Sequence, residues 1–152
     1  MNISKLMKER VRRVEVLLKE LGYSIESEEL ADSGYGASVF ENDQYVFGLT
    51  VDKTSKYLEL GYTFGFSRGF QERIRRSMED VMGISYEHGC YTTLTMDDKE
   101  IVLSVFSKIY FAGLNYYALK ETVRDLLEGI TMISELFDFA NQLQGDDAYG
   151  NP

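Results

Sequence analysis

The residue types best suited to chemistry are scarce in this chain. His88 is the only histidine and Cys90 the only cysteine, and they lie two positions apart. On a strand that spacing puts both side chains on one face, but with no second cysteine or histidine it does not make a zinc site. The acidic pairs Asp97–Asp98 and Asp146–Asp147 fall in a predicted hairpin and a predicted tail, where little burial is available to shift a carboxyl pKa. We therefore expect no catalytic residues, no metal and no cofactor, and a protein that is not an enzyme.

Size and composition predict one globular domain. The chain has 152 residues, of which 44% are hydrophobic, and this is enough to build a core without disulfides. We predict a single domain over residues 1–143 and a flexible acidic tail over residues 144–152. A lone cysteine fits a reducing compartment, the first ten residues lack the apolar core of a signal peptide, and no apolar run is long enough for a spanning helix. The expected location is the cytoplasm.

The charge of the chain limits its partners. A formal net charge of −9 argues against nucleic acid and anionic membranes, because both require a basic footprint. Basic residues concentrate in the first predicted helix and in the cluster Arg73, Arg75 and Arg76. These charged side chains either keep exposed faces of the protein soluble or contact a charged protein partner.

Hydrophobic periodicity predicts an α+β fold in the order helix, three strands, helix, two strands, helix, with about five strands in an antiparallel sheet packed with helices. The expected helices cover residues 3–21, 69–83 and 115–143, and the expected strands cover residues 36–41, 44–51, 56–66, 86–95 and 100–110. Gly22 is placed to end the first helix, Ser67 to cap the second, and Asn42–Asp43 to form a tight hairpin. Residues 26–36 are predicted to be a loop, because they are polar and contain turn residues.

One predicted strand is apolar on both faces. Along residues 100–110, Val102, Phe106 and Tyr110 lie opposite the face expected to join the core. Either loops and helices of the same chain cover this second face, or a second subunit does.

The first predicted helix combines an apolar stripe with a basic face. Met7, Val11, Val14 and Leu18 share the stripe, and Arg12 and Arg13 belong to the basic face. We predict that these six residues contact an acidic segment of a protein partner.

The order of elements resembles a known fold. Three segments are the basis of the resemblance: the end of the first helix, Leu17–Tyr23, the second hairpin, Tyr91–Thr95 with Glu100–Val105, and the run Leu114–Leu119 that leads into the last helix. Together they resemble the type III secretion chaperone-like fold, which includes the acidic class I secretion chaperones of bacteria and the YbjN-like proteins, described as candidate sensory transduction regulators.

The resemblance implies a homodimer that binds an extended or partly folded client and catalyses no reaction. It also implies a dimer contact on the middle helix, where Arg73, Arg75 and Arg76 depart from an apolar surface. The complete set of expected dimer residues is Phe70, Ile74, Met78, Val102, Phe106 and Tyr110. Two alternatives stay open: a YbjN-like sensory regulator or ligand-sensing domain with a pocket lined by tyrosines, and an acidic immunity or inhibitor protein that neutralises a basic toxin.

Overall fold

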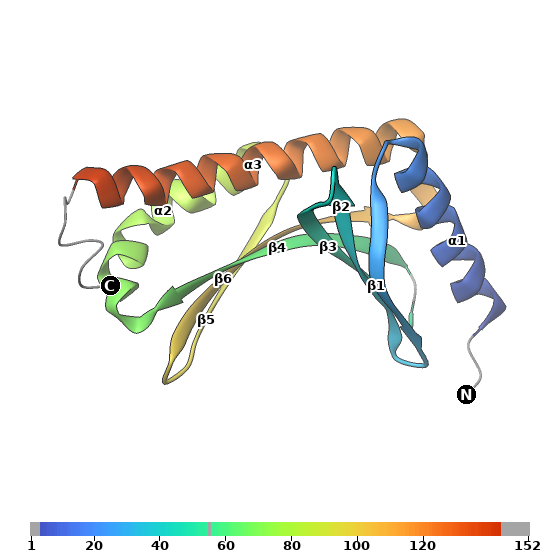
Figure 1. The fold of residues 1–152 in the computed structure, drawn as a ribbon, viewed down its shortest axis with the longest axis horizontal. Coiled ribbons are helices and arrows are strands. Elements are labelled where there is room, and N and C mark those ends of the chain that lie inside the picture. The colour runs from blue at the N-terminus through green and yellow to red at the C-terminus, as the bar shows by residue number, and fades with distance from the viewer. Residues whose placement is uncertain (1–3, 55, 144–152) are drawn as a thin grey trace. The chain divides into compact units, whose positions relative to one another are not determined.

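The computed structural model describes residues 4–54 and 56–143 (Figure 1). The elements, in chain order, are α1 (Lys5–Glu20), β1 (Ser24–Ala31), β2 (Gly34–Glu41), β3 (Gln44–Asp52), β4 (Tyr57–Ser67), the short 3-10 helix η1 (Arg68–Phe70), α2 (Gln71–Glu87), β5 (Tyr91–Met96), β6 (Glu100–Tyr110), the 3-10 helix η2 (Phe111–Gly113) and α3 (Tyr116–Leu143). The strands form an antiparallel six-stranded sheet in the order β1-β2-β3-β4-β6-β5. The predicted α+β class with an antiparallel sheet and packed helices is confirmed.

The chain forms two compact units. Unit 1 is drawn from residues 1–62 and 107–124, and unit 2 from residues 63–106 and 125–152. Each unit is described by itself below. The predicted single domain over residues 1–143 stays a prediction, and the predicted acidic tail over residues 144–152 lies outside the described residues.

Helix α1 begins and ends where its sequence predicts. The Ser4 side chain accepts a hydrogen bond from the Met7 backbone N–H at 3.0 Å, which caps the first turn. At the other end, Gly22 has a φ of +94°. Its N–H bonds to the carbonyl of Lys19, and the N–H of Tyr23 bonds to the carbonyl of Leu18, each at 3.0 Å. This is a Schellman ending, which needs a residue tolerant of left-handed backbone angles.

The segment predicted as a loop contains an additional strand, and that prediction was wrong. β1 covers Ser24–Ala31 and pairs with β2 from Ser24↔Phe40 to Ala31↔Gly34. Its register shifts between Glu26 and Glu29, and Ser27 there has a φ of +55°. The bulge interrupts the alternation of side chains, so the segment carries no period-two hydrophobic signal. Its strand conformation comes from backbone pairing with β2.

The first predicted hairpin is confirmed. Asn42 and Asp43 both have positive φ, +52° and +64°, and Glu41 pairs with Gln44 on either side of them. Two consecutive left-handed residues match the twist of antiparallel strands. At the opposite end of β2, Gly34 pairs with Asp52 at a φ of +143°.

The boundary between α2 and β5 differs from the prediction. The helix was expected to end near residue 83 and a strand to begin at 86, but α2 continues to Glu87 and β5 begins at Tyr91. Ser85 is buried and its hydroxyl lies 2.6 Å from that of Thr92, so packing inside unit 2 holds this stretch as helix. Gly89, with a φ of +64°, then turns the chain into β5. Ser67, expected as a cap, makes no side-chain capping bond.

Each unit has its own buried core. In unit 1, one face of α1, alternate residues of β2, β3 and β4 and the first turns of α3 supply most of the buried residues. The buried apolar residues there are Met7, Val11, Val14, Leu18, Tyr35, Val39, Phe47, Leu49, Val51, Leu58, Leu60, Ile109, Phe111, Leu114, Leu119 and Val123. In unit 2 they are Ile74, Val81, Ile101, Leu103, Val105, Leu126, Ile130, Ile133 and Phe137.

Candidate functional site

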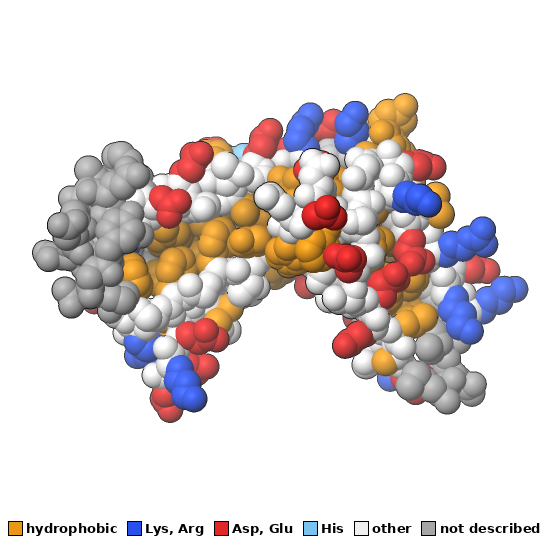
Figure 2. All heavy atoms as spheres, in the orientation of Figure 1, with side chains coloured by type: hydrophobic (Ala, Val, Ile, Leu, Met, Phe, Trp, Pro, Cys, Tyr) orange, Lys and Arg blue, Asp and Glu red, His pale blue; other side chains and the backbone are white. Residues whose placement is uncertain are grey.

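Unit 2 contains an aromatic pocket of about 320 Å³, lined by Gly65, Phe66, Ser67, Phe70, Arg73, Phe137 and Asp138. The end of β4 and η1 supply the first four residues, α2 supplies the arginine, and α3 supplies the last two. The ring of Phe66 lies 4.9 Å from that of Phe137 and 6.1 Å from that of Phe70, centroid to centroid. Figure 2 shows hydrophobic side chains gathered on the visible face of unit 2 below α3.

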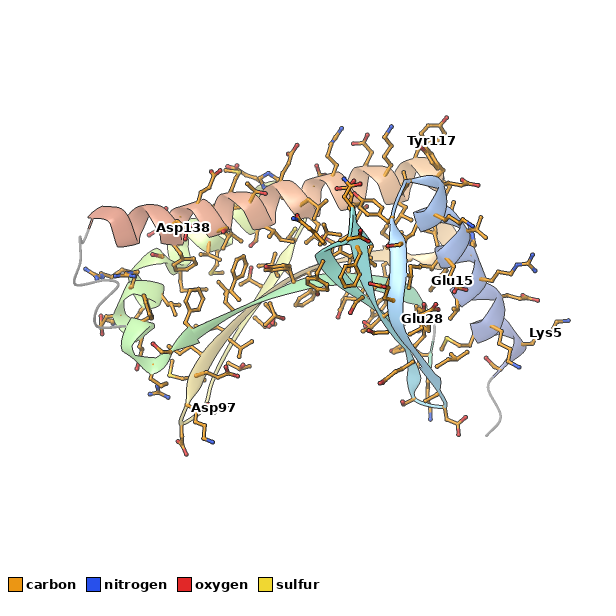
Figure 3. The ribbon with its side chains drawn as sticks, in the orientation of Figure 1. Lys5, Glu15, Glu28, Asp97, Tyr117 and Asp138 are labelled. Atoms are coloured by element: carbon orange, nitrogen blue, oxygen red, sulfur yellow. The ribbon has the colours of Figure 1, made fainter. Side chains whose placement is uncertain are left out.

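A charged side chain forms one wall of this aromatic pocket. Arg73 is 8% exposed, and its guanidinium carbon lies 4.8 Å from the centroid of the Phe70 ring. A desolvated arginine over an aromatic face is stabilised by about 2 kcal/mol. The carboxylate of Asp138, on the exposed side of α3, lies at the rim; Figure 3 shows it beside the aromatic side chains under that helix.

The three arginines that the sequence groups together have different environments. Arg73 is buried in the wall of the aromatic pocket. Arg75 is exposed and pairs with Glu72 at 2.8 Å, and the exposed Arg76 donates to the Glu72 backbone carbonyl at 3.4 Å. Arg75 and Arg76 are therefore solvent-exposed surface charges, while Arg73 is the one arginine of the cluster that lines the pocket.

The second feature of unit 2 is the outer edge of β5. This strand stands at the end of the sheet and, within the described residues, pairs with β6 alone, in continuous register from Tyr91↔Phe106 to Met96↔Ile101. Tyr91, Leu94 and Met96 are 56%, 40% and 42% exposed. The Tyr91 ring stacks on that of Phe106 at 5.7 Å. The edge therefore presents apolar side chains beside backbone groups that face away from β6.

Unit 1 holds a small group of polar side chains between α1 and β1. The Tyr35 hydroxyl donates to Glu28 Oε2 at 2.7 Å, and Figure 3 shows Glu28 side by side with Glu15. Burial raises the pKa of the Glu15 carboxyl, and the hydrogen bond and negative charge of Glu28 raise it further. Burial also raises the pKa of Tyr35, as do its bond to Glu28 and the two carboxylate charges. These groups interact with one another within unit 1 and do not line the aromatic pocket.

The predicted partner-binding residues of α1 are divided by their burial. Met7, Val11, Val14 and Leu18 are at most 6% exposed and belong to the core of unit 1, so they do not form an open surface. The exposed Arg13 donates from its guanidinium to the backbone carbonyls of Phe111, at 3.3 Å, and Leu114. Arg12 is exposed.

Partner binding at α1 stays a prediction, and it can use only the outer side of the helix. A shallow pocket of about 330 Å³ lies there, lined by Leu6, Glu9, Arg10, Arg13, Phe111 and Ala112. The Arg10 guanidinium carbon lies 4.8 Å from the centroid of the Phe111 ring in this pocket.

The predicted dimer residues also differ in exposure. Ile74 is 1% exposed and is closed off inside unit 2. Phe70, Met78, Val102 and Phe106 are half-buried. Tyr110, in unit 1, is 63% exposed and packs edge-on against Tyr57 at 5.9 Å. The five residues other than Ile74 keep exposed surface, and their role in a dimer stays a prediction.

His88 and Cys90 do not share a strand face as predicted, because both precede β5. His88 caps α2, with its Nδ1 donating to the Ile84 carbonyl at 2.8 Å and its Nε2 lying 3.7 Å from Glu128 Oε2. The Cys90 thiol points to the His88 carbonyl at 3.4 Å. Among the described residues there is no group of three or more His, Cys, Asp or Glu side chains that could hold a metal ion.

Sequence reasoning missed the aromatic pocket. Phe66, Phe70 and Phe137 come from three different elements, and each fits the apolar pattern of its own strand or helix. Arg73 lies one position before the predicted apolar stripe residue Ile74, and nothing in the sequence marks it as buried. Its burial depends on the packing of α2 in unit 2.

Comparison with known proteins identifies the fold. No protein-family model matches the chain, and no curated protein matches it. An uncharacterized protein from Methanothermobacter thermautotrophicus has a solved structure that matches with a TM-score of 0.64 at 14% identity, over 84% of this chain and 96% of that one. YbjN from E. coli, described as a candidate transcription regulator, matches with a TM-score of 0.60 at 19% identity, over 93% of this chain and 96% of that one.

The chain therefore has a YbjN-like α+β fold, as the resemblance implied. Its relation to the secretion chaperones stays a prediction. No helix in the described ranges 4–54 and 56–143 is long and apolar enough to cross a membrane.

Proposed function

We propose that this protein is a non-enzymatic binding module that takes up an extended segment of a protein partner along β5. The observation that carries the proposal is the strand itself, Tyr-Thr-Thr-Leu-Thr-Met, an uncharged edge strand with three exposed apolar side chains. An unprotected edge presents a row of backbone donors and acceptors to which another chain can add as a further strand.

The two edges of the sheet are built differently. β1, at one edge, carries Glu26, Glu28 and Glu29 and a bulge at Ser27. Charges and bulges are the devices by which proteins prevent other strands from adding to an edge. β5, at the other edge, has neither, and its register with β6 is regular over all its residues. This contrast favours β5 as the edge that receives a partner.

The surroundings of β5 indicate the chemistry of that partner. Tyr91 and Leu94 point to opposite faces of the strand, so a partner strand can contact an apolar side chain on either face. The adjoining hairpin exposes Asp97, Asp98 and Glu100. The fitting partner is an extended segment with alternating apolar residues and a lysine or arginine at the end that meets the hairpin.

Peptide selection tests this proposal. A phage-displayed library of random dodecapeptides is selected on the wild-type chain, and synthetic copies of the enriched peptides are then titrated by calorimetry. The substitutions Leu94→Lys and Met96→Lys together place charge on the edge, and Val16→Lys on α1, where the valine is 47% exposed, is the matched control. We expect the double variant to bind at least about tenfold more weakly and the control to bind unchanged. Equal binding by the double variant would exclude β5 as the binding edge. So would a ¹⁵N NMR titration of the wild-type chain in which the peptide shifts only amides outside β5.

We also propose that the binding module is a homodimer. The half-buried Val102 and Phe106 and the stacked Tyr91 leave apolar surface on the face of the unit 2 strands opposite the buried Ile101 and Leu103. Light scattering at micromolar concentration is expected to give about twice the chain mass, and a monomer would contradict the proposal. If Leu94→Lys with Met96→Lys converts a dimer into a monomer, β5 receives a second copy of the chain rather than a client.

A regulatory role is compatible with this mode of binding. The E. coli relative is described as a candidate transcription regulator. A net charge of −9 opposes contact with the DNA backbone. Any regulation by this chain is therefore proposed to act through protein contacts.

A further inference from the structure

We propose that unit 1 binds an acidic segment of a protein partner on the outer side of α1, with one apolar side chain of that segment in the shallow pocket between α1 and η2. The pocket, of about 330 Å³, is lined by Leu6, Glu9, Arg10, Arg13, Phe111 and Ala112. An acidic partner is what the sequence predicts, but the apolar contact lies outside the stripe of α1, because that stripe is buried. The site belongs to unit 1 and does not depend on β5.

The charge of this part of α1 is opposite to that of the chain. Residues 5–13 contain five cations and one anion, whereas the whole chain has a formal net charge of −9. Figure 2 shows basic side chains along the visible side of α1. Nine helical residues span about 12 Å. A segment with several carboxylates can therefore meet more of these charges than one small anion can. The cations are Lys5, Lys8, Arg10, Arg12 and Arg13.

The two arginines of the pocket have no carboxylate partner. Within residues 4–54 and 56–143, no carboxylate oxygen lies within 4.0 Å of a guanidinium nitrogen of Arg10 or Arg13. Arg13 donates to the backbone carbonyls of Phe111 and Leu114, which holds its guanidinium in place. The guanidinium carbon of Arg10 lies 4.8 Å from the centroid of the Phe111 ring. A positioned guanidinium is suited to bind a carboxylate through two parallel hydrogen bonds.

The rest of the lining suits an apolar anchor. Leu6 is 51% exposed, and Ala112 is exposed across the pocket from α1. The volume of about 330 Å³ is near the lower end of the range of about 300–1,000 Å³ for small binding sites, which fits one large side chain. Glu9 is the one anion of the lining and repels a carboxylate placed beside it. The fitting segment therefore has an apolar residue at its centre and carboxylates on both sides of it.

Matched probes separate the acidic and apolar contributions. The parent is the acetylated and amidated peptide Asp-Glu-Asp-Phe-Asp-Glu-Asp. One variant peptide has alanine in place of phenylalanine, a second has asparagine and glutamine in place of the acids, and 3-phenylpropionate stands for a small carboxylate. Calorimetry with the full-length chain is expected to show that the parent binds at least about tenfold more tightly than each of the other three. In an assigned ¹⁵N spectrum, its amide shifts are expected at Leu6, Glu9 and Ala112.

Variants of the chain assign the roles of the lining residues. Arg10→Gln is expected to weaken the parent peptide about tenfold and to leave the neutral peptide unchanged. Lys19→Gln, exposed near the end of the same helix, is its control. Glu9→Gln is expected to tighten the parent about twofold or more, because a repelling charge is removed. Leu6→Ser should remove the advantage of the parent over the alanine peptide, and Val16→Ser, at a valine that is 47% exposed, is the control. Circular dichroism checks that each variant is folded.

Several results would overturn the proposed site. They are no binding of the parent peptide at millimolar concentration, equal binding by 3-phenylpropionate, and an Arg10→Gln variant that binds the parent as well as the wild type does. If Arg10→Gln converts a dimer into a monomer in light scattering, the surface receives a second copy of the chain instead. Leu94→Lys with Met96→Lys is expected to leave the parent peptide unaffected. Weaker binding by that double variant would move the peptide to β5, so the two sites are tested separately.

Discussion

Tyr35 donates a hydrogen bond of 2.7 Å from its hydroxyl to the carboxylate of Glu28, joining β2 to β1 next to Glu15 of α1. The bond satisfies the hydroxyl of a tyrosine that is 3% exposed. It also holds a negative charge near a second carboxyl group. The stability of unit 1 should therefore depend on pH through Glu15.

The first prediction concerns Glu15→Gln. Burial and Glu28 raise the folded-state pKa of Glu15 above its ordinary value of 4.5. The folded chain then binds the proton more strongly than the unfolded chain, so this group stabilises the fold below pH 4.5, and stability falls as pH rises through the folded-state pKa. Glutamine removes the charge, so the variant should lose that fall and gain stability at neutral pH relative to the wild type. Urea unfolding across a pH series measures this difference. Glu20→Gln, exposed at the end of the same helix, is the control, and parallel pH curves for the two variants would contradict the assignment.

The second prediction separates Arg12 from Arg13. Arg13 holds the backbone carbonyls of Phe111 and Leu114, which connects α1 to η2 and the residue after it. Arg13→Gln should cost about 1–2 kcal/mol of unfolding free energy, because charged hydrogen bonds are lost. Arg12→Gln, at an exposed position, should change it by less than about 0.5 kcal/mol. Thermal unfolding of the two variants measures the difference. Equal melting temperatures would show that the hydrogen bonds of Arg13 do not contribute to stability.

The third prediction concerns Gly34. A Cβ added there would lie 2.4 Å from the Val51 carbonyl oxygen, at a φ of +143° that side chains rarely adopt. Gly34→Ala should therefore destabilise unit 1 by roughly 3 kcal/mol or more. Gly83 lies inside α2 with nothing within 4 Å of an added Cβ. Gly83→Ala should stabilise the chain by about 0.5–1 kcal/mol. Denaturant midpoints test both substitutions. A loss of stability in Gly83→Ala would contradict the open space around an added Cβ at that position.

The fourth prediction concerns the start of α3. The side chain of Asn115 accepts a hydrogen bond from the Ala118 N–H at 2.9 Å, which caps the helix. Asn115→Ala should cost about 1 kcal/mol, whereas Asn115→Asp should retain most of the stability, because aspartate caps as well as asparagine does. Equal losses in the two variants, measured by urea unfolding, would show that the cap contributes little.

The elements with strong local signals could be read from the sequence. The Gly22 stop after α1, the Asn42–Asp43 turn and the β6 boundaries at residues 100 and 110 agree with their predictions. In each case a few neighbouring residues determine the conformation, through a backbone angle or a short side-chain period. Local sequence signals fail where the conformation of a segment is determined by a paired strand or a packed helix. β1 has no alternation of its own and is a strand because β2 pairs with it, and α2 continues to Glu87 because Ser85 packs against Thr92.

The candidate sites show the same limit more strongly. The apolar stripe of α1 was identified correctly as a stripe, but only packing shows that Met7, Val11, Val14 and Leu18 belong to the core of unit 1. Likewise, no sequence pattern distinguishes the buried Arg73 from the exposed Arg75 and Arg76.

By itself, the sequence determined the α+β class, the antiparallel arrangement and the end of α1 at Gly22. These follow from local propensity, periodicity and composition, which act over a few residues. The tertiary structure alone decided that β1 and β5 are the two edge strands of the sheet, and that Phe66, Phe70, Arg73, Phe137 and Asp138 line one pocket. The physical reason is that strand order and pocket walls depend on contacts between residues far apart in the chain. Such contacts leave no short-range period in the sequence.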